Sequence, residues 1–361
     1  MKKRIAGMAA TLLAAVLLFS PKAQALSARH AILLDAQTGR VLFERNADAK
    51  SLIASTTKIM TALVISQQCN VLDRVRIPKE AVGIEGSSMY LQEGEILTIQ
   101  ELLYGLMLHS GNDAAVALAI CCGGTVEGFA EMMNDKAYML GLKNTHFVNP
   151  HGLDAPGHYS TAEDLATLAA YAMEDPIFYR TVSAKTVTIG TRYLTNHNKL
   201  LWRVEGADGV KTGYTKKSGR CLVSASKKDG KLIIAVTLND GNDWQDHRAL
   251  LDLGLSLVES KVFSPVKNSI TLDMTNGEQI TLKVPSVEIS VTENTNVDYK
   301  IELPAFLYLP LKSGTQIGKV IYICNNNVVM EIPIELDNDK GYKKNKIKLL
   351  FEIFKSMFLS F

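Results

Sequence analysis

The sequence carries almost no net charge: 39 Lys and Arg side chains stand against 37 Asp and Glu in 361 residues, a formal charge of +2. This near-neutral balance gives no support for a nucleic-acid-binding surface, which needs an excess of basic side chains. The chain also lacks an internal repeat and a low-complexity tract, so repeat architectures are not indicated. What remains is an ordinary globular composition, 47% hydrophobic, with enough length for two or three domains.

Cysteines are few and odd in number: Cys69, Cys121, Cys122, Cys221 and Cys324. An exported chain can form disulfides, but an odd count leaves at least one thiol unpaired, and a chain of this length needs no stapling. Cys121 and Cys122 end the apolar stretch "AAVALAICC", which favours small buried hydrophobic side chains. We therefore expect no redox or metal role for the cysteines.

The apolar run at the N-terminus is too short to cross a membrane. It extends from Ile5 to Phe19, about 15 residues where roughly 20 are needed. The basic residues 2–4 precede it and Ala23-Gln24-Ala25 follows, which is the layout of a secretory signal with its cleavage site. We expect residues 1–25 to be a signal peptide, and the mature protein to be exported and to act outside the cytoplasmic membrane.

Residues 26–262 predict a mixed α/β domain. The stretch "HAILLDAQTGRVLFERNAD" predicts a β-hairpin, and "CLVSAS" and "KLIIAVTL" predict another around Asp229-Gly230. Capping boxes at Thr98–Glu101 and Ser160–Glu163 each predict the start of a helix. Further helices are expected at about 126–140, closed by Gly141, and at about 244–260.

The remaining chain predicts a small β-rich domain over 263–338 and an amphipathic helix over 339–361. "SITLDM", "QITLKV", "KVIYICN" and "VVMEIPIEL" have the composition of strands. The last segment has an apolar face and a neighbouring basic run, Lys343 to Lys348. That pattern favours an anchor helix on the outer face of the cytoplasmic membrane. The alternative is a helix that docks on the β-rich domain. Its apolar face consists of Ile347, Leu350, Phe351, Phe354, Phe358 and Phe361.

Lys58 breaks a local rule in "ASTTKIMTALV". Ser55 resembles a helix N-cap, and Glu or Gln is expected three residues later, yet that position is a cation in the positive first turn. At i, i+3 spacing Ser55 and Lys58 share a helix face. A serine hydroxyl becomes a nucleophile when a base takes its proton, and a lysine is that base when burial or nearby positive charge lowers its pKa. The pattern S-x-x-K also occurs at Ser224 and Ser264, so alone it is weak.

Two further motifs make the set specific. Ser110-Gly111-Asn112, between two expected helices, is the single S-x-N in the chain and offers a hydroxyl and an amide. Lys211-Thr212-Gly213 enters a strand and offers a cation, a hydroxyl and a glycine that permits close backbone approach. K-[ST]-G recurs at Lys217 and Lys312. The ordered combination of all three motifs within one exported domain is the informative feature.

The ordered set resembles the penicillin-binding proteins and serine β-lactamases. More closely, the chain is similar to the low-molecular-weight penicillin-binding proteins, the serine-type D-alanyl-D-alanine carboxypeptidases, over nearly its whole length. The stretches "FVNPHGLD", "HYSTAEDLA" and "VKTGYTKKSGRCLVSAS" add to that resemblance. It implies an antiparallel sheet flanked by helices, cleavage of the terminal D-alanine from peptidoglycan stem peptides, reaction with β-lactams and no cofactor.

The resemblance also assigns roles to residues. It implies that Ser55 is acylated, that Lys58 is its general base, and that Ser110, alone or together with Lys211, passes a proton to the departing D-alanine. Asn112 would hold the substrate amide, and Lys211 and Thr212 the terminal carboxylate, an anion that needs charge-assisted partners. The backbone N–H groups of Ser55 and Tyr214, the latter just after Gly213, would form the oxyanion hole.

One departure from the family pattern concerns the carboxylate. Some relatives carry an arginine just after the strand "LIIAVTL", where this chain has "NDGNDWQDHRALL" and Arg248 does not align clearly. Endopeptidase or transpeptidase activity on the same fold is therefore an alternative. A class A β-lactamase is disfavoured because the chain has S-G-N in place of S-D-N and lacks an E-x-x-L-N loop.

Two further hypotheses are a zinc peptidase and a non-catalytic wall-binding module. Zinc would need His146, His151 and His158 with Asp154, but these lie in a Gly- and Pro-rich stretch and not at i, i+4 on a helix. We expect them to be structural loop residues and expect no metal. The intact set of Ser55, Lys58 and Lys211 argues against a module that only binds.

Overall fold

A computed structural model describes residues 26–275, 277–293, 295–324 and 326–340. The expected signal peptide, residues 1–25, lies outside the described residues. So does the expected anchor helix beyond its first two positions.

The first part of the described chain contains both strands and helices, and the predicted mixed α/β fold class is confirmed. Its elements are β1 His30–Asp35, β2 Arg40–Arg45, the 3-10 helix η1 Ala54–Thr57, α2 Lys58–Gln68, β3 Arg74–Arg76, η2 Lys79–Ala81, β4 Ile96–Thr98, α3 Ile99–Leu108, α4 Asn112–Gly123, α5 Val126–Met139, α6 Ala162–Ala172, α7 Pro176–Ser183, β5 Thr186–Ile189, β6 Arg192–Thr195, α8 Leu200–Arg203, β7 Ala207–Thr215, β8 Gly219–Lys228, β9 Lys231–Leu238 and α9 Asp243–Leu257.

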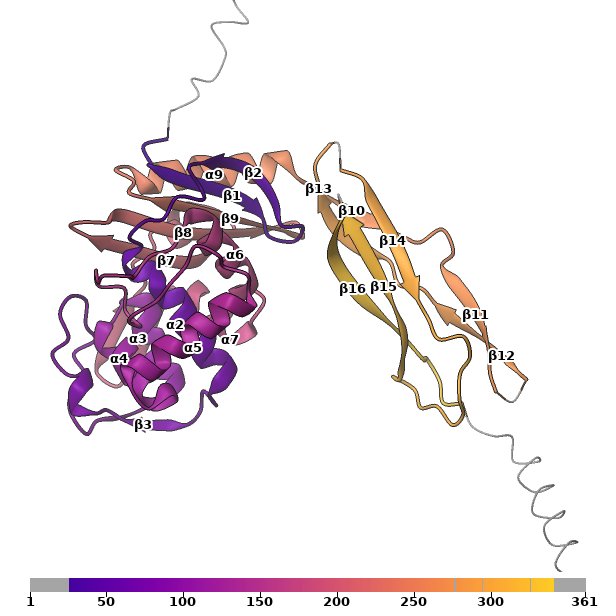
Figure 1. Cartoon of the computed structure of the whole chain (residues 1–361), viewed down its shortest axis with the longest axis horizontal. Helices are drawn as coiled ribbons and strands as arrows, with labels where there is room; N and C mark the ends of the chain where they lie inside the picture. The colour runs from indigo at the N-terminus through magenta and orange to yellow at the C-terminus, as the bar shows by residue number, and fades with distance from the viewer. Residues whose placement is uncertain (1–25, 276, 294, 325, 341–361) are drawn as a thin grey trace, which may run out of the picture.

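A five-stranded antiparallel sheet forms the centre of this part, in the order β2-β1-β9-β8-β7. Alternate residues of a strand point to opposite faces. In β1, Ile32 and Leu34 accordingly join the core shared with the helical side, while Leu33 packs with Leu250 and Leu251 of α9 on the other face. Figure 1 shows α9 on one side of the sheet and α2 to α7 on the other. β7 is an edge strand of this sheet.

Helices α2 and α4 are core helices rather than amphipathic surface helices. Residues 58–66 of α2 and residues 112–119 of α4 are all buried. A helix that is apolar on all sides belongs in a core, and each buried aliphatic side chain such as Ile59 or Leu63 contributes about 1.5–3 kcal/mol. This packing fixes the first residues of both helices, Lys58 and Asn112. They lie together at the side of the helical layer that is next to η1 and β7.

The second part of the chain is β-rich and has its own hydrophobic core, separate from that of the first. Three antiparallel groups build it: β10 with β13, β11 with β12, and β14-β15-β16. Its elements are β10 Glu259–Phe263, β11 Ser269–Asp273, β12 Gln279–Lys283, β13 Val287–Val291, β14 Val297–Glu302, β15 Gln316–Cys324 and β16 Asn327–Glu335. The expected boundary between residues 262 and 263 falls inside β10, which pairs with β13 and so continues the second part.

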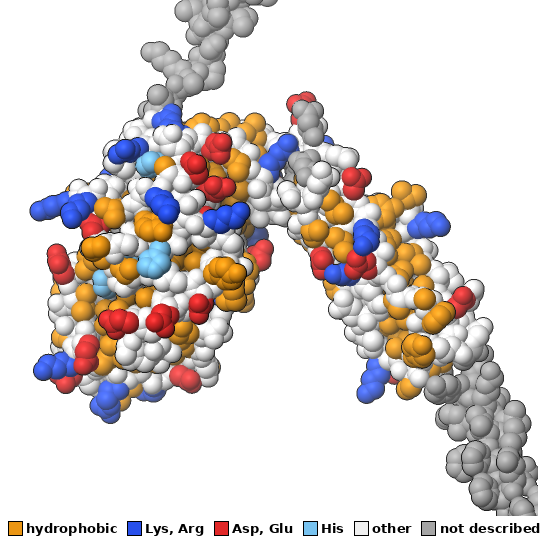
Figure 2. Space-filling view, in the orientation of Figure 1, with side chains coloured by type: hydrophobic (Ala, Val, Ile, Leu, Met, Phe, Trp, Pro, Cys, Tyr) orange, Lys and Arg blue, Asp and Glu red, His pale blue; other side chains and the backbone are white. Residues whose placement is uncertain are grey.

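The two parts meet at the turn between β1 and β2. Ser290 Oγ lies 2.8 Å from Asp35 Oδ1, and Gln37 Nε2 donates to Glu288 O at 2.8 Å. On the face in Figure 2, basic and acidic side chains are interspersed over both parts. This mixture agrees with the near-zero net charge.

Most expected helix starts are confirmed, with one shifted by a residue. Thr98 and Glu101 form the expected capping box of α3. The cap of α6 is Thr161, whose side chain accepts from Asp164 N, so the expected Ser160–Glu163 box is wrong. Among the described residues, no single helix is long and apolar enough to span a membrane, although α4 and α5 together, bent by 82°, satisfy the length and composition criteria.

Candidate active site

Ser55 does not cap a helix, contrary to the sequence expectation. It lies in η1, the single 3-10 turn before α2, and the residue before it, Ala54, has a left-handed φ of +46°. η1 contacts the edge strand β7. The half-buried Ser55 side chain therefore makes no capping hydrogen bond. It lies where η1 connects the edge strand β7 to helix α2.

Lys58 is fully buried at the first position of α2, and its ammonium group has three oxygen partners. Nζ lies 3.0 Å from Ser55 Oγ, 2.7 Å from Asn112 Oδ1 and 2.6 Å from His151 O. Burial, followed by the positive charge of Lys211, lowers the pKa of Lys58 well below its ordinary value, while Asp113 opposes the shift. A neutral amine can still donate to Asn112 and His151 and present its lone pair to the Ser55 hydroxyl.

The turn between α3 and α4 presents Ser110 and Asn112. Ser110 has a left-handed φ of +62°, a strained conformation of the kind that clusters at functional sites. Gly111 N donates to Gly105 O at 3.0 Å, and this bond ties the turn to α3. Asn112 is buried between Lys58 and Glu85 O, to which Nδ2 donates at 2.5 Å. Asn112 therefore holds the lysine, and its amide keeps one N–H and one lone pair beyond these two bonds.

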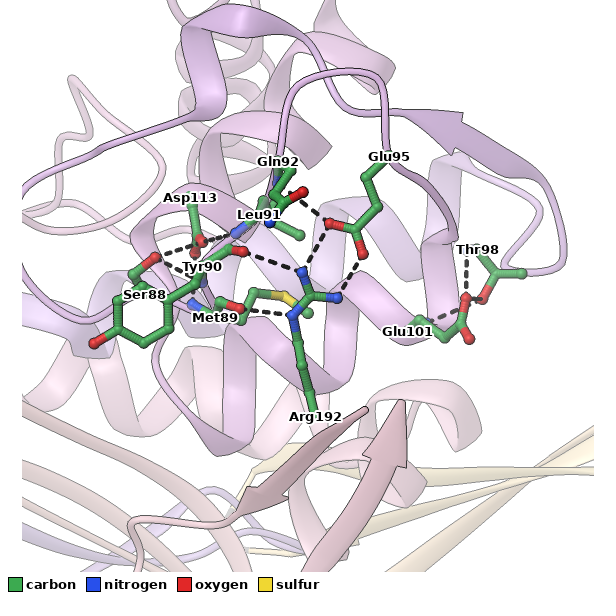
Figure 3. Close-up of polar contacts among 10 residues, drawn as sticks. All are labelled: Ser88, Met89, Tyr90, Leu91, Gln92, Glu95, Thr98, Glu101, Asp113 and Arg192. Atoms are coloured by element: carbon green, nitrogen blue, oxygen red, sulfur yellow. Dashed lines mark hydrogen bonds and ion pairs between the residues drawn. The ribbon is translucent and has the colours of Figure 1, made fainter. Parts of the chain in front are cut away.

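A buried carboxylate holds the neighbouring loop in place. Asp113, the second residue of α4, accepts hydrogen bonds from Met89 N at 3.1 Å and Leu91 N at 3.0 Å, and Arg192 Nε donates to Met89 O at 2.8 Å (Figure 3). The same loop carries Ser87, whose carbonyl accepts from Asn112 N at 2.7 Å. These contacts fix the loop beside the Ser110 turn.

The K-T-G motif lies on the edge strand β7, with its three residues in different environments. Lys211 is buried behind the strand, where Nζ donates to Thr212 O at 3.0 Å and burial lowers its pKa to about 7. Thr212 and Gly213 are half-buried and face η1. A Cβ on Gly213 would lie 3.1 Å from Ser55 N and 3.2 Å from Ile53 O. A side chain at this position would be tight against η1 and would require its backbone to give by a few tenths of an ångström.

A second glycine supports the same turn from the other side. Gly152 has a φ of +87°, and a Cβ there would lie only 1.9 Å from Ala54 O. The preceding carbonyl, His151 O, is the one that accepts from Lys58. The "NPHGLD" stretch is thus a backbone support for η1 and for the lysine.

Around Ser55 there is a cleft of about 350 Å³. It is lined by Ser55, Ser87, Ser110, His197, Lys199, Thr212, Gly213, Tyr214, Arg220, Asp243 and Trp244. Five predicted site residues line it, and the other three, Lys58, Asn112 and Lys211, are buried behind it. The five lining residues are therefore open to a ligand, while the two lysines are kept from water.

Sequence reasoning missed Arg220. Its Nη2 lies 2.8 Å from Asp243 Oδ2, and its guanidinium lies 5.6 Å from the Trp244 ring centre. It stands opposite Tyr214 in the β7–β8 register, and counting that hairpin from its turn would have placed it there. Arg248, by contrast, pairs with Asp252 at 3.9 Å and does not line this cleft.

The competing serine at position 224 lies away from the cleft, and the histidines contact the site as structural partners. Ser224 is fully buried beneath α9 and bonds to His247 Nδ1 at 2.6 Å, so it is inaccessible. His158 is buried, its Nδ1 accepts from Val148 N at 3.1 Å, and its Nε2 lies 2.8 Å from Thr57 Oγ1 in η1. Burial lowers the pKa of His158 to about 4. Within the described residues, no group of three or more His, Cys, Asp or Glu side chains is arranged to hold a metal ion.

The chain is similar to known proteins over most of its length. The family model described as D-alanyl-D-alanine carboxypeptidase, peptidase S11, matches residues 18–242. D-alanyl-D-alanine carboxypeptidase DacF of Bacillus subtilis (strain 168) is 31% identical over 340 residues, covering 86% of this chain and 85% of that protein. The crystal structure of penicillin binding protein 5 from Haemophilus influenzae matches with a TM-score of 0.66 and 30% identity, over 88% of this chain and 98% of that one. The Streptomyces K15 DD-transpeptidase matches with a TM-score of 0.62 and 34% identity, over 64% and 98%.

Proposed function

The chain belongs to the D-alanyl-D-alanine carboxypeptidase family of S11 peptidases, and from that premise we propose how its own residues carry out the reaction. The activity is serine-type hydrolysis of the D-alanyl-D-alanine bond. The substrate is the stem peptide of peptidoglycan. The observation that carries the proposal is the 3.0 Å contact between Ser55 Oγ and the buried Lys58 Nζ at the edge of an open cleft.

Acylation begins with transfer of the Ser55 hydroxyl proton to neutral Lys58. The serine oxygen attacks the carbonyl carbon between the two D-alanines and forms a tetrahedral intermediate. The Asn112 and His151 oxygens hold Nζ in place in both protonation states, because the amine keeps two N–H donors after losing its proton. The lowered pKa makes the neutral form of Lys58 more available than that of an exposed lysine, which general-base catalysis requires.

The developing oxyanion is placed between η1 and β7. The backbone N–H groups of Ser55 and Tyr214 are the proposed donors, and the close approach of Gly213 to Ser55 N supports this pairing. Because β7 is an edge strand, an extended substrate backbone can align along it as an added strand.

Collapse of the intermediate requires a proton for the departing amine of D-alanine. Ser110 lines the cleft opposite β7 and supplies a hydroxyl for that relay, with Lys58 as the proton source. Water then takes the place of the amine. It loses a proton to Lys58 and attacks the ester carbonyl carbon on Ser55. The bond from that carbon to Ser55 Oγ then breaks, Oγ takes the proton back from Lys58, and the shortened stem peptide leaves the free enzyme.

The terminal carboxylate needs cationic partners in the cleft. We assign Thr212 and Lys211 to it, as the family pattern implies, and add Arg220. Lys211 has a pKa of about 7 and is therefore only partly charged near neutral pH, whereas a guanidinium is always charged. Arg220 lines the cleft beside Thr212, and Asp243 holds one edge of its guanidinium. Arg220 thus takes the role that an arginine after β9 has in some relatives, because Arg248 does not line the cleft.

The acyl-enzyme could also pass to an amine, which would make the protein a transpeptidase. The related Streptomyces K15 protein is named as a DD-transpeptidase in its structure, and endopeptidase action would cut a cross-link by the same chemistry. Mass spectrometry of the products from stem pentapeptide, with and without an added D-amino acid acceptor, separates hydrolysis from transfer.

In the cell we propose that the chain is exported by residues 1–25 and is held at the outer face of the cytoplasmic membrane by residues 339–361. There it trims stem peptides during wall remodelling and so contributes to cell shape. The basic run and apolar face of the C-terminal segment support this placement.

Covalent labelling tests the proposed nucleophile. Penicillin resembles the terminal dipeptide and should acylate the serine, so digestion of the adduct should place the label on the peptide that contains Ser55. Ser55→Ala should abolish labelling while the thermal midpoint stays close to that of the parent. Ser224→Ala, in the buried copy of the motif, should still be labelled. A label on Ser110 or Ser224 would overturn the assignment.

A further inference from the structure

Helices α2 and α4 carry site residues at one end and cysteines at the other. Lys58 begins α2 and Cys69 is its C-cap; Asn112 begins α4 and Cys122 lies in its last turn. The first residues are joined by the 2.7 Å bond from Lys58 Nζ to Asn112 Oδ1. At the other ends, the Cys69 and Cys122 side chains are joined by a hydrogen bond between thiols. The two helices therefore lie side by side, with matched ends in contact.

The two thiols are unequal in a way that suits exchange chemistry. The hydrogen bond from Cys69 lowers the pKa of Cys122, and the same bond raises the pKa of Cys69. Both side chains are half-buried, and Cys121 beside them is exposed. Cys221 and Cys324 are buried, and burial raises the pKa of Cys221 to about 11. Cys122 is thus the member of the pair that forms a thiolate, the reactive species of cysteine.

We propose that Cys69 and Cys122 form a disulfide that links the C-terminal ends of α2 and α4. The sequence suggested only small hydrophobic side chains here, because the contact joins residues far apart in the chain. The proposal depends on the proposed export of the chain, because an extracytoplasmic compartment permits disulfides. It depends on no other part of the proposed function. A shared metal ion does not account for the pair, because the described residues near these thiols form no group of three or more ligands.

The bond forms by two exchange steps with an external disulfide, either a small-molecule disulfide or an exported dithiol–disulfide oxidoreductase. The Cys122 thiolate attacks one sulfur of the external disulfide, forms a mixed disulfide and releases one thiolate. Cys69 then loses its proton and attacks the Cys122 sulfur, which releases the second thiolate. Two protein thiols are oxidised and one external disulfide is reduced to two thiols.

The disulfide closes a loop from residue 69 to residue 122, which contains the Ser110 turn and the loop held by Asp113. Such a closure restricts the unfolded chain more than the folded one. It also fixes the ends of the two helices whose first residues hold the catalytic lysine. We therefore expect a more stable frame and unchanged acylation chemistry, because the thiols lie one helix length away from Ser55.

Oxidation of the purified full-length protein tests the proposal. The protein is equilibrated with oxidised and reduced glutathione, free thiols are blocked with an alkylating agent, and peptides are mapped without reduction. A peptide pair joined through Cys69 and Cys122 is expected. The thermal midpoint of the oxidised protein should rise by about 5–10 °C over that of the reduced protein.

Matched single variants separate the three neighbouring thiols. Cys69→Ser and Cys122→Ser should each lose the oxidation-dependent shift, while Cys121→Ser should keep it. Penicillin labelling of Ser55 is followed in parallel, so a failure of the proposed catalysis is distinguishable from a failure of this disulfide. The proposal is overturned if the mapped bond is Cys121–Cys122 or Cys69–Cys121, if no bond forms in excess oxidised glutathione, or if Cys69→Ser retains the shift.

Discussion

At the scale of single residues, the site depends on a lysine that has been removed from water. An ammonium ion with no solvent contact holds its proton less tightly, and the positive charge of Lys211 weakens that hold further. Three oxygen partners keep the cost of burying Lys58 low enough for the fold to tolerate it. The surrounding aliphatic side chains of α2 provide the burial. Apolar packing lowers the pKa of Lys58, and the hydrogen bonds hold its amine in position, so both are needed for it to act as a base.

The pH dependence of acylation should report the lysine. Because the base is neutral Lys58, the penicillin acylation rate should rise with pH through a lysine pKa lowered below 10.5. Lys58→Arg keeps the charge but supplies no neutral base, so its rate should fall at least about 100-fold. Stopped-flow acylation between pH 5 and 10 measures both effects.

Stability provides the control for the same residue. Between the folded and unfolded pKa values of Lys58 the unfolded chain binds more protons, so the free energy of unfolding should rise with pH across that window. In Lys58→Met, the free energy of unfolding should no longer show the part of this rise with pH that comes from Lys58. Near-normal acylation by a folded Lys58→Arg protein would show that the lysine is only structural.

Arg220 should govern recognition of the carboxylate. Replacing it by Gln removes a charge-assisted contact worth about 1.5–3 kcal/mol, so KM for a D-alanyl-D-alanine peptide should rise roughly 10- to 100-fold with a smaller change in kcat. Arg248→Gln is the matched control, because Arg248 is paired with Asp252 outside the cleft. A peptide with a C-terminal amide should be cut equally slowly by the parent and the Arg220→Gln protein. If Arg248→Gln produces the larger effect on KM, the assignment to Arg220 is wrong.

At the scale of elements, the turn that presents Ser55 is supported by backbone from two directions. Gly152 in the 149–153 stretch approaches η1 more closely than a side chain allows, and Gly213 on β7 leaves only a tight space for one. η1 itself has no side-chain cap hydrogen bond, so it relies on these two neighbouring segments for its position. The position of the nucleophile is therefore set by segments that follow it by about 100 and 160 residues in the chain.

Two glycine-to-alanine variants test this support. Gly152 and Gly39 both have positive φ, +87° and +68°, so Ala should cost each about 1–2 kcal/mol in backbone strain. At Gly39 nothing lies within 4 Å of an added Cβ, whereas at Gly152 it would meet Ala54 O. Gly152→Ala should therefore lose more stability and much of its acylation rate, while Gly39→Ala keeps its acylation rate. Equal thermal shifts with normal acylation in both would refute the role of Gly152.

The sequence predicted regular elements well where the signal was local. The β1–β2 hairpin, the β8–β9 hairpin and the capping box of α3 depend on neighbouring residues and are confirmed. Ser55 was misread as a cap because a 3-10 turn stabilised by β7 and Gly152 has no signature in its own residues. The Cys69–Cys122 contact was missed for the same reason, since it joins segments that only the tertiary fold brings together. Arg220 is a different case, because the local β7–β8 hairpin register already places it opposite Tyr214.

At the scale of the whole molecule, the β-rich part lies in the sequence between the residues of the cleft and the C-terminal segment. The cleft lies in the first part, and the described chain ends in the second part, remote from the five-stranded sheet (Figure 1). Lys340 closes a two-way bridge with Leu311, through N–O distances of 2.7 and 2.8 Å. A cut after residue 340 therefore preserves the described hydrogen bonds of the β-rich part.

Truncation after Lys340 should release the protein from membranes and leave penicillin acylation unchanged. The apolar residues beyond that point contribute up to about 1.5–3 kcal/mol each when fully buried, and the lysines about 1 kcal/mol each on anionic lipid. Full-length protein should bind anionic vesicles in a flotation assay, and high salt should weaken that binding without abolishing it. Replacing Lys343, Lys344, Lys346 and Lys348 by Gln is the matched control, and should reduce binding to anionic vesicles while leaving residual binding through the apolar face. If the truncated protein unfolds, or the full-length protein ignores vesicles, the segment packs on the protein itself and does not anchor it.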